Sequence, residues 1–198
     1  MSPEAVLDFW FGAPGSDAAV IERQRSLWFG KSAGADAAVK AGFSDALVDA
    51  HAGRLDAWAA TPRGLLALIV VLDQFPHHIH RNQAAAFACD AQALDWALTA
   101  LKTDADRALK PVERIFVYLP LEHAESRALQ ACSVALYAEL AHESAPEARA
   151  LFDSFLDYAV QHRDVVARFG RFPHRNAVLG RASTDAEVEF LKQPGSRF

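Results

Sequence analysis

The sequence TPRGLLALIVVLDQFPHHIHR, residues 61–81, holds the longest apolar run of the chain. Its first two residues are typical of a helix start, because threonine caps a first turn and proline fits the first helical position. The run is apolar on all sides, which predicts a helix over residues 63–73 at the centre of the fold. Pro76 disfavours helical geometry at the residue before it, so we expect the chain to turn at residues 75–81.

Apolar residues recur at helical spacing along the rest of the chain, and strand-like alternation is nowhere sustained. Ser2 with Pro3 indicates one helix start, and Thr184 with Glu187 three residues later fits a capping box. The predicted fold class is all-α, with about nine helices in antiparallel pairs. The length favours a single domain over residues 1–198.

Prolines mark further helix boundaries in the second half of the chain. Pro111 starts a helix that Pro120 is expected to kink or stop within three turns. Helix then resumes over residues 121–141. Pro146 opens a long amphipathic helix that ends near Gly170.

The composition limits the classes of partner. A net charge of -5 gives no field that would attract nucleic acid or an anionic membrane. The longest apolar run is far shorter than the roughly 20 residues of a membrane-spanning helix, and the first residues lack the pattern of a secretory signal. Cys89 and Cys132, each among small and apolar residues, are expected to be buried reduced thiols in a cytoplasmic protein.

A loop with the sequence FGRFPHRNAVLGR, residues 169–181, follows the long helix and concentrates cationic side chains. Guanidinium groups bind carboxylates and phosphates in a bidentate manner, so the loop is a candidate anion site. The alternative is structural, because arginine donors also hold helix ends and buried carboxylates. The candidate residues of the loop are Arg171, His174, Arg175, Asn176 and Arg181, with Arg168 just before it.

The segment LPLEHAE, residues 119–125, brings two carboxylates and a histidine together. On an ideal helix His123 points about 100° away from Glu122 and still further from Glu125, so no metal site is predicted. His123 is a candidate general acid or base, with Glu122 or Glu125 to orient it. Carboxylates at a helix start are also expected on dipole grounds alone.

Asp73 lies at the end of the most apolar predicted helix, where a carboxylate needs a cationic partner or water. We expect Arg175 or Arg171 to be that partner. His77, His78 and His80 follow, but neighbouring residues of an irregular turn point in different directions, which does not favour a built metal site. Asp90 is interpreted as a helix cap.

These motifs together resemble a family of uncharacterised, mainly bacterial proteins of unknown function. The resemblance rests on residues 72–76, 119–125 and 169–176 with 179–181, and on matches at both ends of the chain. It implies an all-helical fold similar to the tetratricopeptide-like superfamily, in which stacked helix pairs present a concave face. It implies no established activity. The family usually has Arg-Asn after Asp-Gln-Phe-Pro, where this chain has His77-His78.

Three hypotheses of function follow. The first is binding of a small anionic molecule or a peptide carboxylate by the arginine- and histidine-containing loop, with Asp73 nearby. The second is an enzyme, a hydrolase or transferase, that uses His123 or His174 with Glu122 or Glu125 as acid and base. The third is a helical interaction module whose motifs are purely structural. No glycine-rich phosphate loop or Gly-x-Ser-x-Gly elbow is present, and no cofactor is predicted.

Overall fold

The computed structural model describes residues 1–30 and 32–196, which form helices and connecting segments without a strand. The all-α prediction is confirmed. The α-helices are α1 (Pro3–Phe11), α2 (Asp17–Phe29), α3 (Ala33–His51), α4 (Pro62–Ile69), α5 (Phe75–Ile79), α6 (Asp90–Lys102), α7 (Pro111–His123), α8 (Arg127–Glu143), α9 (Arg149–Phe169) and α10 (Asp185–Phe190). Short helical turns join them: η1 (Asp56–Ala60), η2 (Val70–Gln74), η3 (Ala84–Phe87), η4 (Ala105–Ala108) and η5 (Pro173–Arg175).

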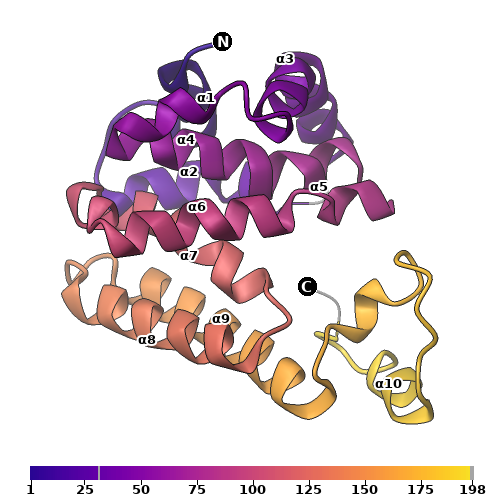
Figure 1. The fold of residues 1–198 in the computed structure, drawn as a ribbon. Coiled ribbons are helices and arrows are strands. Elements are labelled where there is room, and N and C mark those ends of the chain that lie inside the picture. The colour runs from indigo at the N-terminus through magenta and orange to yellow at the C-terminus, as the bar shows by residue number, and fades with distance from the viewer. Residues whose placement is uncertain (31, 197–198) are drawn as a thin grey trace.

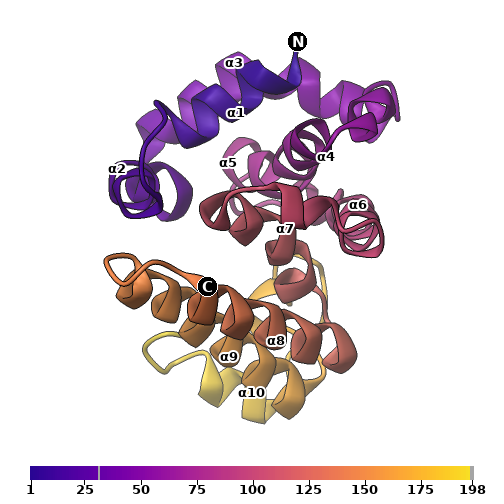
Figure 2. The ribbon, with the colours of Figure 1, turned by 90° about the vertical axis from the view of Figure 1, so that its left-hand side faces the viewer.

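The helices form an upper and a lower part (Figure 1). The first six lie together, α7 connects the two parts, and α8 and α9 pack side by side below (Figure 2). The C-terminal segment, residues 170–196, leaves the end of α9 and returns to the side of α5 (Figure 1). It is the part of the chain that carries the predicted cationic loop.

Helix α4 begins as the sequence predicts and lies at the centre of the core. The Oγ1 atom of Thr61 accepts a hydrogen bond from the backbone of Gly64, and residues 65–72 are almost completely buried. Gly64 is required by a close approach, because a Cβ atom there would collide with the carbonyl oxygen of Trp58. The central position predicted for this helix is confirmed.

The predicted turn at residues 75–81 is wrong for residues 75–79, which are helical, and the chain turns only from His80 onward. The chain continues from α4 through the π-helical turn η2 directly into α5, and Phe75 donates its backbone N–H to the carbonyl oxygen of Val70. The wider turn relieves the clash between the ring of Pro76 and the preceding carbonyl groups. Asp73 and Gln74 therefore lie within continuous, buried helix.

Pro120 also fails to stop its helix. Helix α7 continues through this proline to His123, and nearly every residue from 112 to 122 is buried. Packing on all sides compensates the hydrogen bond that proline cannot donate. The break comes later, at residues 124–126, where Ser126 caps the start of α8.

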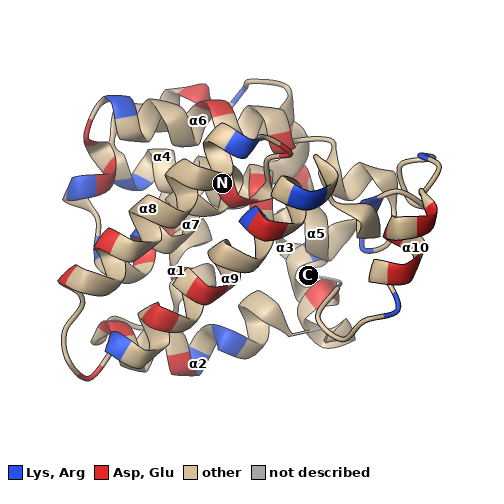
Figure 3. Ribbon diagram, turned by 90° about the horizontal axis from the view of Figure 1, so that it is seen from below, with Lys and Arg blue, Asp and Glu red and all other residues tan. Residues whose placement is uncertain are grey.

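Surface features complete the fold. Basic and acidic positions are spread over the ribbon and stand side by side on α2 (Figure 3). Cys89 is buried as expected, but Cys132 is exposed because it lies on the outer side of α8, whose inner side carries Ser133 and Tyr137. Among the described residues no helix has the length and apolar character needed to cross a membrane.

Candidate functional site

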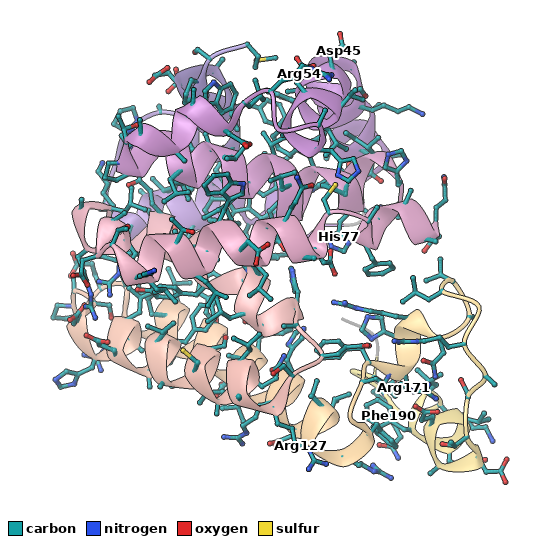
Figure 4. All side chains as sticks on the ribbon, viewed as in Figure 1. Asp45, Arg54, His77, Arg127, Arg171 and Phe190 are labelled. Atoms are coloured by element: carbon teal, nitrogen blue, oxygen red, sulfur yellow. The ribbon has the colours of Figure 1, made fainter. Side chains whose placement is uncertain are left out.

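Five ionisable side chains from separate elements meet where α5, α6 and α7 face the C-terminal segment. We call this cluster the polar centre. In Figure 4 His77 lies on the side of α5 nearest the C-terminal segment, which carries Arg171 and Phe190. The elements that supply the cluster are η2, α5, α6, α7 and η5. The polar centre consists of Asp73, His77, Asp90, His123 and Arg175.

The partner of Asp73 is His123, not an arginine as expected. The Nδ1 atom of His123 lies 2.8 Å from Oδ1 of Asp73, and Gln74 donates from Nε2 to the other carboxylate oxygen at 2.5 Å. Burial alone would raise the pKa of Asp73, but His123, together with His77 and Gln74, outweighs burial and leaves this pKa lowered. The same pairing raises the pKa of His123 against the effect of its burial. Asp73 and His123 thus form a buried ion pair.

This pair gives His123 a defined orientation. Nδ1 is engaged with Asp73, so the second ring nitrogen, Nε2, is on the opposite edge of the ring. The His123 side chain keeps 17% of its surface exposed, whereas Asp73 keeps 1%. A histidine held at Nδ1 by a buried carboxylate has the arrangement of an oriented general base or acid.

His77 stands beside this pair as a neutral imidazole. Its ring centroid is 5.6 Å from that of His123 and 5.3 Å from that of Phe87. Burial, reinforced by the charge of His123, lowers the pKa of His77 to about 3. Its buried Nε2 atom has no hydrogen-bond partner in the structure.

Arg175 is positioned mainly by aromatic rings that contact its guanidinium group. Its guanidinium group lies 4.7 Å from the ring centroids of both Phe87 and Phe172, a double cation–π contact. At its edge, Nη1 donates to Oδ2 of Asp90 at 3.2 Å, while the buried Nε has no hydrogen-bond partner. Burial lowers the pKa of Arg175, although Asp90 opposes this effect.

Asp90 completes the cluster at the start of α6. Burial raises its pKa to about 6, in spite of His123 and Arg175, and its buried Oδ1 atom has no hydrogen-bond partner. Asp90 is thus more than the helix cap expected from the sequence, since the position before the first turn of α6 belongs to Cys89.

The aromatic rings around the polar centre form a closed circuit. Neighbouring ring centroids are 5.3 to 6.5 Å apart, and the Arg175 guanidinium closes the circuit between the two phenylalanines. The circuit joins α9 and the C-terminal segment to η3, α5 and α7, so the site exists only in the folded chain. Its members are Phe87, His77, His123, His162, Phe172 and Arg175.

The other candidate cations of the loop are engaged in clamps. Arg171 donates to both carboxylate oxygens of Glu187 at 2.7 and 2.9 Å. Arg181 donates to both oxygens of Glu125 at 2.6 and 2.9 Å, and also to Oδ1 of Asn176 at 3.0 Å. We call Arg171–Glu187 and Arg181–Glu125 the outer clamps. They hold the C-terminal segment in shape and leave Arg175 as the loop arginine that enters the polar centre.

The remaining candidates lie beside the cluster. Glu122 is 3.0 Å from Nδ1 of His162, so the carboxylate that orients His123 is neither Glu122 nor Glu125. The ring centroid of His174 is 5.7 Å from that of Phe172, and burial lowers the pKa of His174 to about 3. Asn176 donates to Oγ of Ser183 at 3.0 Å and supports the loop.

Sequence reasoning missed several members of the site. His77 was expected in an irregular turn and Asp90 was interpreted as a cap, and the circuit residues Phe87 and His162 were not singled out. A usable signal existed only for His162, which falls on the buried face of the amphipathic α9. The others depend on long-range packing that periodicity does not encode.

A groove of about 540 Å³ lies outside the polar centre, at the outer clamp of Arg171. Of its charged lining groups, Arg171 and Glu187 are paired with each other and Arg168 lies over the ring of Phe169. We therefore place the candidate site at the polar centre, where buried polar atoms have no hydrogen-bond partner. Within residues 1–30 and 32–196, no group of three or more His, Cys, Asp or Glu side chains is arranged to hold a metal ion.

The comparisons with known proteins agree with this picture of fold and motifs. A family model described as "Bacterial protein of unknown function (DUF924)" matches residues 6–195. The chain belongs to the DUF924 family. This DUF924 chain is also similar to a solved structure of a protein of unknown function, ATU0120 from Agrobacterium tumefaciens, with 34% identity, 96% of each chain covered and a TM-score of 0.81. No curated protein matches the chain significantly.

Proposed function

We propose that the protein binds a small molecule through an anionic group that Arg175 receives at the polar centre. The observation that supports this most strongly is the state of the Arg175 guanidinium, whose buried Nε has no hydrogen-bond partner. A buried donor without a partner costs free energy, and an oxygen of a bound anion would satisfy it. The outer clamps give the contrast, because Arg171 and Arg181 already donate to carboxylates.

Thermal unfolding with inorganic phosphate and a series of small carboxylates tests this proposal. The wild-type protein should gain thermal stability with at least one anion, because an anion that binds only the folded state shifts the unfolding equilibrium. Arg175→Gln should abolish the gain. Arg168→Gln is the matched control, since Arg168 is exposed and stacks on the ring of Phe169 at 4.6 Å.

Arg175→Met guards against a general loss of structure, because methionine keeps apolar contact with the two phenylalanine rings. If Arg175→Met folds and still responds to the anion as the wild type does, Arg175 is not the binding group. A wild-type protein that responds to none of the anions also contradicts the proposal.

A second function, acid–base catalysis, is supported by the Asp73–His123 pair. Of the acid–base hypotheses, this geometry favours His123 over His174, with Asp73 as the orienting carboxylate. We expect any hydrolase or transferase turnover of an anionic substrate to be lost in His123→Gln. In Asp73→Asn the pH–rate profile should shift to lower pH, because the pairing that raises the pKa of His123 is removed. A broad substrate screen without turnover would reject this second function.

Two further predictions accompany the proposed function. The consecutive packing of α7 on α8 and of α8 on α9 supports a tetratricopeptide-like stack of helix pairs. The thiols of Cys89 and Cys132 are both free, which supports a reducing compartment such as the cytoplasm.

A purely structural interaction module is less well supported, because the large exposed apolar side chains of the helices are spread over α2, α3, α6, α9 and α10.

A further inference from the structure

We infer that the ligand of the polar centre is a zwitterion of the amino-acid class, with its carboxylate on Arg175 and its ammonium group on Asp90. This inference rests on the proposed function, since it takes the anionic group at Arg175 as given. It adds the second recognition group and therefore the chemical class of the ligand.

First, the Asp90–Arg175 pair contains two buried polar atoms without a hydrogen-bond partner. Arg175 offers a buried donor, Nε, and Asp90 offers a buried acceptor, Oδ1, neither of which has a hydrogen-bond partner. The two side chains are in contact at 3.2 Å through other atoms. An acceptor and a donor on two side chains in contact suit a ligand whose ammonium and carboxylate groups share one carbon atom, as in an α-amino acid.

The second step concerns charge. Asp73 and His123 form one ion pair, and Asp90 and Arg175 form another, so the cluster balances its own charges. A ligand with only a negative charge would add an uncompensated charge close to the carboxylates of Asp73 and Asp90, so it should bind more weakly than a zwitterion. A zwitterion brings one charge of each sign and keeps the balance.

The third step concerns the protonation of Asp90. Burial raises the pKa of this carboxyl group to about 6. An ammonium group at Oδ1 would favour the ionised carboxylate and satisfy the acceptor. The neutral His77 supplies one more unpartnered atom, Nε2, for a polar group of the ligand.

The fourth step concerns access. Asp90 keeps 23% of its side-chain surface exposed and His123 keeps 17%, whereas Arg175 keeps 8%. Asp90 and His123 therefore mark the solvent edge of the cluster, and Arg175 lies deeper. A ligand entering from this edge would pass Asp90 before it reaches the deeper Arg175, with its ammonium group at the buried Oδ1 atom of Asp90 and its carboxylate on Arg175.

The test is titration calorimetry of the full chain with matched pairs of probes. Each common α-amino acid is compared with its des-amino carboxylic acid, for example alanine with propionate. For at least one pair, the amino acid should bind about tenfold tighter or better, because a charge-assisted hydrogen bond to Asp90 is gained. Asp90→Asn should remove that preference, and Asp95→Asn, an exposed position on the same helix, should keep it.

The outcomes separate the two proposals. Equal binding of both members of every pair, with binding lost in Arg175→Gln, overturns the zwitterion and leaves the anion site intact. The same holds if inorganic phosphate binds through Arg175 and no amino acid does. If no probe binds the wild-type protein, the proposed anion site fails and the inference fails with it. A preference for the amino acid that survives in Asp90→Asn overturns the assignment of its ammonium group.

Discussion

Glu187 and Asp90 are each paired with an arginine of the same C-terminal loop, yet the pKa values of these two carboxyl groups move in opposite directions. Arg171 and the backbone N–H of Thr184 donate to Glu187 and lower its pKa to about 2. Asp90 has a single contact at 3.2 Å with Arg175, and burial raises its pKa to about 6. The outer clamp therefore stabilises the charged carboxylate, whereas the polar centre disfavours it.

This difference teaches how to distinguish a structural arginine from a candidate binding arginine in one loop. Arg171 and Arg181 are bidentate to carboxylates, and their pairs tie the segment together. Arg175 is more buried but has fewer hydrogen bonds, and its position depends on two phenylalanine rings. Buried polar atoms without a partner lower the stability of the fold, and such groups are found at ligand-binding and catalytic sites.

The largest effect on stability is expected for Asp73→Ala. This substitution tests whether the Asp73–His123 pair of the polar centre stabilises the fold, as the outer clamps do. The substitution leaves buried His123 and Gln74 without their acceptor, so the free energy of unfolding should fall by about 3–5 kcal/mol. Urea unfolding measures this change. Asp157→Ala, at an exposed position of α9, is the control and should stay within about 0.5 kcal/mol of wild type. A small loss in Asp73→Ala would show that this pair does not stabilise the fold.

A smaller effect of opposite sign is expected for Asp90→Asn. The pKa of Asp90 is raised from 3.8 to about 6 in the folded protein. Between these pH values the folded state binds the proton more tightly than the unfolded chain, so wild-type stability falls as pH rises. Removing the titration should make the variant more stable than wild type above pH 6, by an amount on the order of 2–3 kcal/mol.

Urea unfolding of both proteins across this pH range measures the effect of Asp90→Asn. Near pH 4 the two stabilities should approach each other, because the wild-type carboxyl group is protonated there. If Asp90→Asn is the less stable protein above pH 6, Asp90 belongs with the outer clamps, and the contrast between the two regions disappears.

The smallest effect is expected at the outer clamp, in Glu187→Gln. The folded-state pKa of Glu187 is lowered from 4.5 to about 2, so its contribution is present above pH 4.5 and is lost as pH falls through about 2. The variant should lack this acid step. At neutral pH it should lose about 1 kcal/mol, because the pairing with the partly exposed Arg171 is screened by solvent and the capping box of α10 is weakened. Acid unfolding curves that superimpose would contradict the role of the clamp.

Local signals in the sequence predicted much of the fold. The helix start expected at Ser2 and Pro3 is found in α1, and the capping box at Thr184 and Glu187 is present. Such features depend on side chains that are three or four positions apart, which sequence spacing shows directly. The single domain over residues 1–198 stays a prediction. So do the roles of the site residues, because they concern ligands and reactions.

The errors share one physical cause. Pro76 and Pro120 were expected to interrupt helices on local grounds, but tertiary packing stabilises a π-helical turn before the first and a continuous buried helix around the second. The partner of Asp73 was expected to be an arginine. Instead it is His123, 50 positions along the chain, a pairing that local sequence does not encode.

By itself, the sequence determined the helical fold, the central helix, the family and the set of polar residues worth examining. These follow from apolar periodicity, caps and motifs, which are properties of neighbouring positions. Only the tertiary structure decided that Arg171 and Arg181 are clamps and that Arg175 joins Asp73, His77, Asp90 and His123. The reason is that a charged side chain acquires its role from the groups that desolvate it and pair with it, and those groups come from distant parts of the chain.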